Sequence, residues 1–180
     1  MRRWIGWSGV VMGVLVASTV ALPTPAAAWV AFARITNAST GVLIEGGVTQ
    51  KGQEGSITVL GIGNRVQLPT DPASGLPTGK VKITPFEMVK PWDASTPKLV
   101  TAIANNTQLK VEITIFKTTP TGTSVPGFKI TLTGALLSQL DTSYDPGAES
   151  SAVEKLEFTY QKFQWTDLIT GASGSVGTTP

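Results

Sequence analysis

The chain has 180 residues, with 14 Lys and Arg residues, 12 Asp and Glu residues, and neither Cys nor His. The missing residue types exclude thiol nucleophiles, disulfides, Ser-His-Asp triads and metal sites built from His or Cys. The length fits one domain, which can bury about 68–70% of its unfolded surface around a single core. The sequence pI is near 9.0, but the excess of positive charge is Arg2 and Arg3, so the remaining chain is formally neutral. A neutral chain does not favour nucleic acid as a partner.

The N-terminus has the three parts of a secretory signal peptide. Two arginines form a positive region, residues 5–22 are apolar, and a run of small residues ends at Ala28. We expect residues 1–28 to be a signal peptide, cleaved between Ala28 and Trp29. An uncleaved anchor is the alternative, since the apolar run approaches the ~20 residues that span a bilayer. Cleavage predicts an exported protein, periplasmic or extracellular, without a stable membrane anchor.

Beyond the leader, frequent Thr, Val and Ile with closely spaced Gly and Pro indicate β-structure. The apolar residues Val30, Phe32 and Ile35 change phase along the first expected strand, which predicts a β-bulge there. A second strand is expected over residues 55–67. Residues 68–79 hold three prolines and two glycines, and this composition predicts a long excursion loop.

Strands are expected again over residues 80–90 and 109–117. Alternating apolar side chains in the latter segment predict a sheet with one buried face; they are Leu109, Val111, Ile113 and Ile115. Between these strands, Ser95 is an N-cap candidate, Pro97 suits the first helical turn, and residues 99–103 have helical spacing. This short helix should end near Asn105 and Asn106.

The alternation returns at Phe128, Ile130 and Leu132, and residues 145–147 predict a turn. A last strand presents apolar side chains on one face and then changes phase near Gln161, which predicts a second bulge; the side chains before the change are Leu156, Phe158 and Tyr160. Residues 168–180 are rich in Gly, Ser and Thr and are expected to form a flexible tail.

The candidates for chemistry each lack a required part. Residues 75–81 resemble a phosphate-binding loop, but they open a strand and so lack the N–H groups of a helix N-terminus. Residues 61–66 lack the third glycine of a dinucleotide fingerprint. Glu154 and Glu157 are three positions apart, so they should face opposite sides of a strand and form a solvated surface instead of a glycosidase pair. The sequence therefore predicts no catalytic, cofactor or metal site.

The segment from Lys80 to Lys117 contains a strand, a junction bearing Lys, Asp, Ser and Pro, a short helix and another strand. Its distinctive residues are Lys80, Val81, Ile83, Phe86, Lys90, Pro91, Asp93, Ser95, Pro97, Leu99 and Ala102. This arrangement resembles the Hcp family, the haemolysin-coregulated proteins that form the tube of the type VI secretion system. The likeness covers about residues 32–167.

The resemblance implies a mainly β fold over residues 29–167, an antiparallel β-barrel or two-sheet domain with one short flanking α-helix. It also implies a non-enzymatic structural protein without a cofactor. Such proteins form hexameric rings that stack into a tube and carry effector proteins in the lumen. Family members have an extended loop that reaches a neighbouring subunit, and the resemblance implies this contact for Leu68, Asp71, Gly75, Leu76 and Gly79.

The leader departs from the family, whose members normally leave through the secretion machine without a Sec signal. One reading is an Hcp-type protein that acts outside the inner membrane; another is a misassigned start codon. The alternative function is an exported Hcp-like β-barrel binding module, independent of type VI secretion, with Trp92 as an exposed contact. A hydrolase that uses only carboxylates is a third and weaker hypothesis.

Overall fold

The computed structural model describes residues 29–119, 122–147 and 152–177. Within these ranges, no helix is long and apolar enough to cross a membrane. The expected signal peptide and Ala28 lie outside the described residues, whereas Trp29 is the first residue of the first strand.

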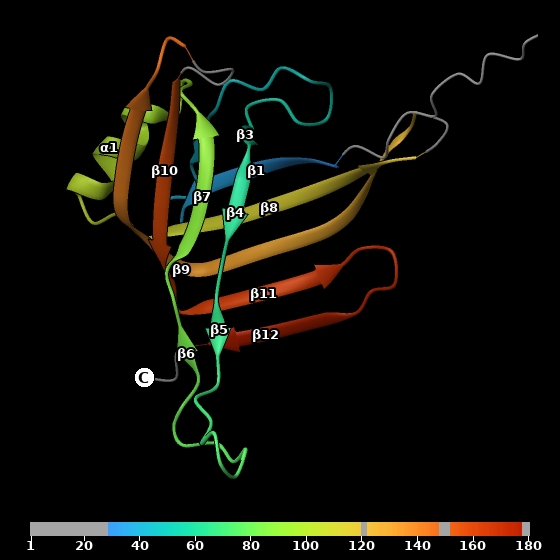
Figure 1. The fold of residues 1–180 in the computed structure, drawn as a ribbon. Coiled ribbons are helices and arrows are strands. Elements are labelled where there is room, and N and C mark those ends of the chain that lie inside the picture. Colours follow the sequence, from blue (N-terminus) through green and yellow to red (C-terminus); the bar gives the residue numbers. More distant parts are fainter. Residues whose placement is uncertain (1–28, 120–121, 148–151, 178–180) are drawn as a thin grey trace, which may run out of the picture.

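Two antiparallel sheets build the domain, and they share one long strand, β9 (Ser124–Tyr144) (Figure 1). The strands of the first sheet are β2 (Leu43–Ile44), β1 (Trp29–Asn37), β8 (Leu109–Thr118), the first part of β9, β11 (Lys162–Asp167) and β12 (Ser173–Gly177), with β3 (Ile57–Val59) also paired to β1. The second sheet contains the last part of β9, β10 (Ala152–Thr159), β7 (Phe86–Pro91) and β4 (Gly61–Gly63). The mainly β, two-sheet fold expected from the sequence is confirmed.

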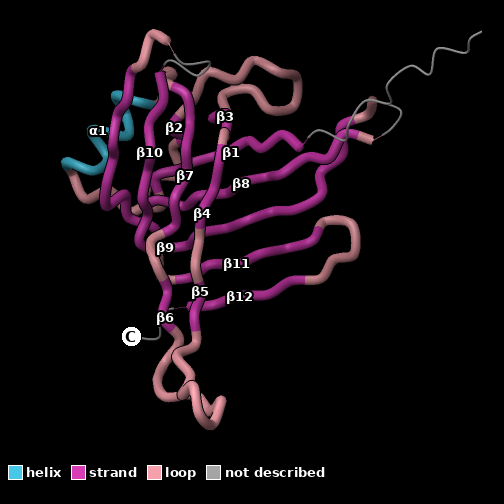
Figure 2. Tube along the Cα trace, viewed as in Figure 1, coloured by secondary structure: helices cyan, strands magenta, loops and turns pink. Residues whose placement is uncertain are grey.

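Two smaller elements complete the described chain. Strands β5 (Val66–Gln67) and β6 (Lys82–Ile83) form a separate two-stranded sheet below the body of the domain (Figure 1). Helix α1 (Thr96–Ala104) flanks the second sheet and is the single α-helix among the described residues (Figure 2).

Strand β9 passes from one sheet to the other at Gly134. Strand β9 pairs with β11 up to Thr133 and with β8 up to Ala135, with a register shift beside Gly134, and from Leu136 onward it pairs with β10. Gly134 has φ +63°, a left-handed conformation that other residues rarely adopt. A Cβ atom at this position would also lie 2.6 Å from the side chain of Gln161. Glycine therefore permits both the bend and the close approach of the next strand.

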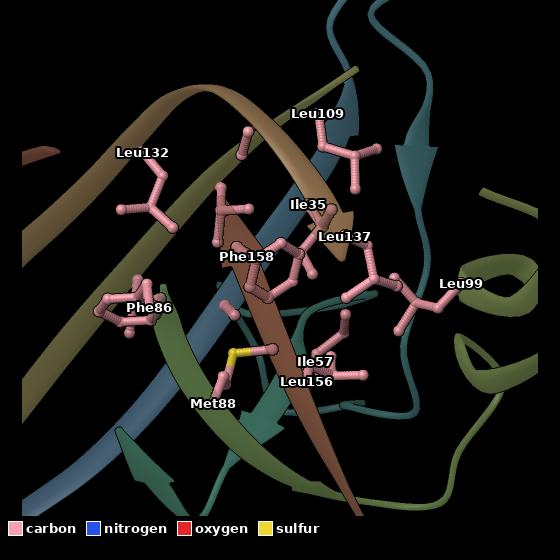
Figure 3. Packing of buried hydrophobic residues seen from close by; sticks show 14 of the residues in the cluster. Ile35, Ile57, Phe86, Met88, Leu99, Leu109, Leu132, Leu137, Leu156 and Phe158 are labelled. Carbon is pink, nitrogen blue, oxygen red and sulfur yellow. The ribbon is translucent and has the colours of Figure 1, made fainter. Parts of the chain in front are cut away.

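The core lies between the inner faces of the two sheets (Figure 3). Ile35, Ile113 and Leu132 extend from the first sheet, while Phe86 and Phe158 extend from the second, and all five are buried. Helix α1 adds Leu99 and Ala102, the residues on its buried side. Burial of each large side chain contributes about 1.5–3 kcal/mol, so this packing fixes the relative position of the sheets and the helix.

The alternation in β8 is confirmed, because Leu109, Val111 and Ile113 are buried while Lys110 is exposed. The bulge expected in β1 is wrong. Strand β1 pairs with β8 in continuous register from Trp29 to Asn37. The apolar residues change phase because Phe32 points to the other face of the sheet, where its ring packs against Phe116 at 5.8 Å.

Three of the expected long strands are divided. Residues 55–67 form β3, β4 and β5, and residues 80–90 form β6 and β7 with Pro85 between them, since proline cannot donate a ladder hydrogen bond. The last expected strand is divided into β10 and β11. The phase change near Gln161, expected to be a bulge, is the boundary between these two strands, which pair with β9 in different sheets.

The C-terminal segment differs from the flexible tail expected for residues 168–180. Strand β12 pairs with β11 in a hairpin. The hairpin turn is held by Asp167, whose Oδ1 accepts hydrogen bonds from the N–H groups of Ile169 (2.8 Å) and Thr170 (3.2 Å), and by Gly171 with φ +78°. These local bonds and the backbone ladder order a segment in which no side chain of residues 168–177 is buried.

Candidate functional site

The junction between β7 and α1 contains a buried ion network around Lys90. The Lys90 side chain is fully buried, and its Nζ donates hydrogen bonds to the carbonyl oxygen of Pro91 (2.9 Å) and to Oγ1 of Thr96 (3.3 Å). The same ammonium forms ion pairs with Oδ1 of Asp93 (3.0 Å) and with Oε1 of Glu154. One cation thus joins β7, the helix start and β10.

Asp93 connects this network to the loop before β3. Its Oδ1 accepts hydrogen bonds from the backbone N–H (2.9 Å) and the hydroxyl (2.6 Å) of Ser95, and its Oδ2 accepts one from the N–H of Gly47 (3.0 Å). Burial raises the pKa of Asp93, but the hydrogen bonds from Ser95 and Lys90 outweigh burial and lower the pKa from its ordinary value. Asp93 is therefore an ionised partner of Lys90 near neutral pH.

Glu154 occupies the opposite side of the same network. It lies directly across from Lys90 in the β7–β10 pairing, and its Oε1 also accepts a hydrogen bond from the hydroxyl of Thr96 (2.9 Å). Its Oε2 is buried without a hydrogen-bond partner. The solvated role expected for Glu154 is therefore wrong. Its position indicates why, since Glu154 has the same parity as the buried residues Leu156 and Phe158.

The geometry of the two glutamates does not form a glycosidase pair. Glu157 lies on the outer face of β10, where its carboxylate pairs with Lys155 (3.1 Å). Glu154 is fully buried, and its charge is compensated by Lys90. Among the residues that the structure describes, no cluster of three His, Cys, Asp or Glu side chains could hold a metal ion.

The other motif residues do not form one cluster. Phe86, Leu99 and Ala102 belong to the core, and Ile83 packs against it. Pro97 lies in the first helical turn, as expected. Ser95 is at the N-cap position, but its side chain bonds Asp93 and makes no capping hydrogen bond. Lys80 and Val81 are exposed outside the core. Some motif residues therefore pack in the core, and others hold the junction between β7 and α1 together.

Residues 64–84 form a projection that we call the arm; it contains β5, β6 and the loop between them, and it extends below the body of the domain (Figure 1). Its loop is ordered by its own hydrogen bonds. Asp71 N–H donates to the Leu76 carbonyl (2.8 Å), and Asp71 Oδ1 accepts from the N–H groups of Ala73 and Ser74 (both 2.8 Å). Gly75 provides the left-handed turn, with φ +69°. Leu68 and Leu76 remain exposed, and so does Gly79.

A row of aromatic rings runs along the inner face of the first sheet, from the core to its free end. The distances between the centres of neighbouring rings are 6.3 Å for Phe86–Phe163, 6.5 Å for Phe163–Trp165, 5.7 Å for Trp165–Phe128 and 6.1 Å for Phe128–Trp29. Trp29 is half exposed, and the Lys117 ammonium lies 5.8 Å from the centre of its ring. Beside Trp29, an apolar cleft of about 200 Å³ separates β1 from β4.

Trp92, considered as an exposed contact, has partners within the chain. Its ring packs against Tyr144 at 6.2 Å, and its Nε1 donates a hydrogen bond to the carbonyl oxygen of Val153 (3.1 Å). Trp92 remains half exposed. These contacts give the side chain a packing role at the end of β10.

Comparisons with known proteins match nearly the whole described domain. Residues 32–166 match the family described as "Type VI secretion system effector, Hcp". A "Major exported protein" of Pseudomonas aeruginosa is 32% identical over 159 residues, which cover 81% of this chain and 92% of that protein.

Solved structures agree with this match. The Hcp1 protein from E. coli EAEC 042 is similar with a TM-score of 0.74 and 26% identity, over 82% of this chain and 97% of the other. The secreted protein Hcp3 from Pseudomonas aeruginosa is similar with a TM-score of 0.68 and 25% identity, over 85% of this chain and 100% of the other.

Proposed function

This chain belongs to the Hcp family of type VI secretion, and on that premise we propose that it is a non-enzymatic structural subunit that assembles into hexameric rings. The rings stack into a tube and hold effector proteins in the lumen. The observation that carries the proposal is the match of the family and of its fold over the described domain. The buried, charge-compensated state of Glu154 supports a structural role over hydrolysis.

The surface of the isolated subunit also supports assembly. Large apolar side chains are exposed on the arm and at the end of the aromatic row, among them Leu68, Leu76, Trp29 and Trp165. Exposed apolar patches mark interaction sites in soluble proteins, and we propose that the arm and the end of the aromatic row are two such sites. We assign the arm, with Leu68, Asp71, Gly75, Leu76 and Gly79, to the contact with a neighbouring subunit. Closed rings bury such surfaces in repeated, identical contacts.

Static light scattering and negative-stain imaging of the purified protein test the ring. The expected result is a particle with six subunits and a central hole. A monomer at all accessible concentrations would overturn the proposal.

We also propose that residues 1–28 are a signal peptide and that the mature protein begins at Trp29, acting outside the inner membrane. The paired arginines, the apolar run and the alanines before Trp29 support this proposal, as does the similarity to a protein named as exported. Mass spectrometry of protein recovered from the periplasm and the medium should find Trp29 as the first residue. A first residue within 1–28 on exported protein would contradict the cleavage site.

A further inference from the structure

Lys90 and Glu154 bring an amine and a carboxyl group into direct contact inside the domain. Both side chains are fully buried, and the register of β7 and β10 sets the two residues directly opposite each other. The next inward side chains on the same strands, Met88 and Leu156, belong to the core and hold the pair in place (Figure 3). Such fixed proximity makes a reaction between two groups intramolecular and can raise its rate by several orders of magnitude.

The network around this pair contains more negative than positive charge. Two carboxylates, those of Asp93 and Glu154, face the single ammonium of Lys90. Attraction between buried charges offsets their loss of hydration only where hydrogen bonds satisfy the remaining atoms, and Oε2 of Glu154 has no such bond. An amide between Lys90 and Glu154 would remove both of these buried charges and leave the carboxylate of Asp93.

The two carboxylates have different surroundings, which assign them different roles. Asp93 accepts hydrogen bonds from the N–H and hydroxyl of Ser95 and from the N–H of Gly47, and these bonds favour its ionised form. Glu154 accepts one hydrogen bond besides that of Lys90, from the hydroxyl of Thr96 to Oε1 (2.9 Å). Glu154 is therefore the carboxyl group open to attack. Asp93 Oδ1, 3.0 Å from Lys90 Nζ, is placed to accept and return a proton.

We propose that Lys90 and Glu154 condense to an intramolecular amide, an isopeptide crosslink between β7 and β10, with Asp93 as the catalytic residue that transfers a proton. The Lys90 ammonium first passes one proton to the carboxylate of Glu154, which gives a neutral amine and a carboxylic acid. The amine nitrogen then attacks Cδ of Glu154, and the Thr96 hydroxyl stabilises the negative charge that develops on Oε1.

The second half of the reaction releases water. Asp93 takes one proton from the attacking nitrogen and returns it to Oε2 of Glu154, which already carries the first proton. The bond between Cδ and Oε2 breaks, Oε2 leaves as water, and Oε1 becomes the carbonyl oxygen of the amide. The products are one amide and one water molecule, and Asp93 is again a carboxylate, so the reaction needs no oxidant and no cofactor.

The crosslink joins two residues that are 64 positions apart in a chain without cysteine. It limits the unfolded chain in the way a disulfide of the same span does, but a reducing agent does not open it. The ion pair is the state in which the chain folds, and the amide forms from it, so loss of either partner weakens the junction in both states. This inference is independent of the proposed ring.

Peptide mapping by mass spectrometry tests the crosslink in the purified protein, expressed as the full chain. Trypsin cuts after lysine but not before proline, so Lys90 lies in the peptide of residues 83–98 and Glu154 in that of residues 130–155. The expected result is that these two peptides are joined, with a total mass lower by one water molecule. Recovery of the two peptides only as separate species overturns the inference. A water loss within residues 83–98 alone also overturns it, because Asp93 would then be the reacting group.

Three variants separate the roles of the residues, each checked for folding by circular dichroism. Glu154→Leu removes the reacting carboxyl group and should give separate peptides only. Asp93→Asn removes the proton carrier, so the joined peptide should form about 100-fold more slowly or less; a rate equal to that of the wild type would overturn the catalytic role of Asp93. The matched control is Glu157→Leu on the outer face of the same strand, which should crosslink as fast as the wild type. Should a variant fail to fold, the wild-type peptide map still decides whether the crosslink exists.

Discussion

Replacing Glu154 with leucine should destabilise the protein far more than the same change at Glu157. Glu154→Leu removes the carboxylate that pairs with the fully buried Lys90, and leaves that ammonium with Asp93 and two neutral oxygen acceptors. Breaking a buried ion pair by removing one partner costs about 3–5 kcal/mol when the other charge is left uncompensated; because Asp93 still pairs with Lys90, we expect the lower end of this range. Glu157 is on the outer face and pairs with an exposed lysine, and such surface pairs contribute about 0–1 kcal/mol.

Removing both charges separates the pair energy from the packing. Lys90→Met alone leaves Glu154 and Asp93 without their shared cation, so we expect a cost of about 3–5 kcal/mol. The double variant Lys90→Met with Glu154→Leu leaves no uncompensated lysine or glutamate. Its cost should fall short of the sum of the single variants by about 2 kcal/mol, within the range measured for residues in direct contact.

Urea unfolding followed by tryptophan fluorescence measures these costs. All variants are compared at one protomer concentration, because assembly adds to the apparent stability. The network would not have its assigned role if Glu154→Leu cost less than about 1 kcal/mol, or if the two single costs added without coupling.

Three further predictions concern single residues. Asp93→Asn removes a carboxylate whose pKa is lowered below its ordinary value of 3.8. The stability that Asp93 contributes is present above about pH 4 and is lost as the pH falls through the folded pKa. The difference in unfolding free energy between wild type and variant, measured by urea unfolding, should therefore shrink below about pH 4, and a constant difference would contradict this. Leu99→Ala empties a buried site between α1 and the sheets and should cost about 2–5 kcal/mol in the same assay; a cost below about 1 kcal/mol would show that α1 is not packed on the core as described. Gly134→Ala places a Cβ 2.6 Å from the Gln161 side chain at φ +63°, so the loss of stability should exceed the ~1 kcal/mol typical of a left-handed residue alone. Thermal unfolding measures this loss, and an unchanged unfolding midpoint would contradict the assigned bend.

Local patterns predicted the regular elements of this fold. The alternation from Leu109 onward identified β8, and Pro97 with the spacing after it identified α1. These features depend on residues close in sequence. The end of the helix near Asn105 and Asn106 also followed from local chemistry, since Asn106 adopts a left-handed φ of 48°.

The features that local patterns missed depend on contacts between distant segments. Glu154 has its partner 64 positions earlier in the chain, and only the pairing of β7 with β10 brings Lys90 next to it. The passage of β9 between sheets similarly depends on two partners, β8 and β10, that lie on either side of it in sequence. The parity of Glu154 with Leu156 was a sequence signal for its burial, but it did not identify the cation.

The arm and the aromatic row differ in the same way: local sequence predicted the arm, whereas the row depends on contacts between distant segments. Composition located the loop of residues 68–79, because prolines and glycines are concentrated there. The row of rings could not be read from composition, since Trp29, Phe128 and Trp165 come from three strands that the sheet brings together.

Native mass spectrometry of the purified, exported protein tests the central claim most directly, because it counts subunits and weighs each one. The proposal predicts an assembly of six copies, each beginning at Trp29, and negative-stain images of the same sample should show rings. A monomer, or an assembly with another number of copies, would contradict the proposed hexameric ring.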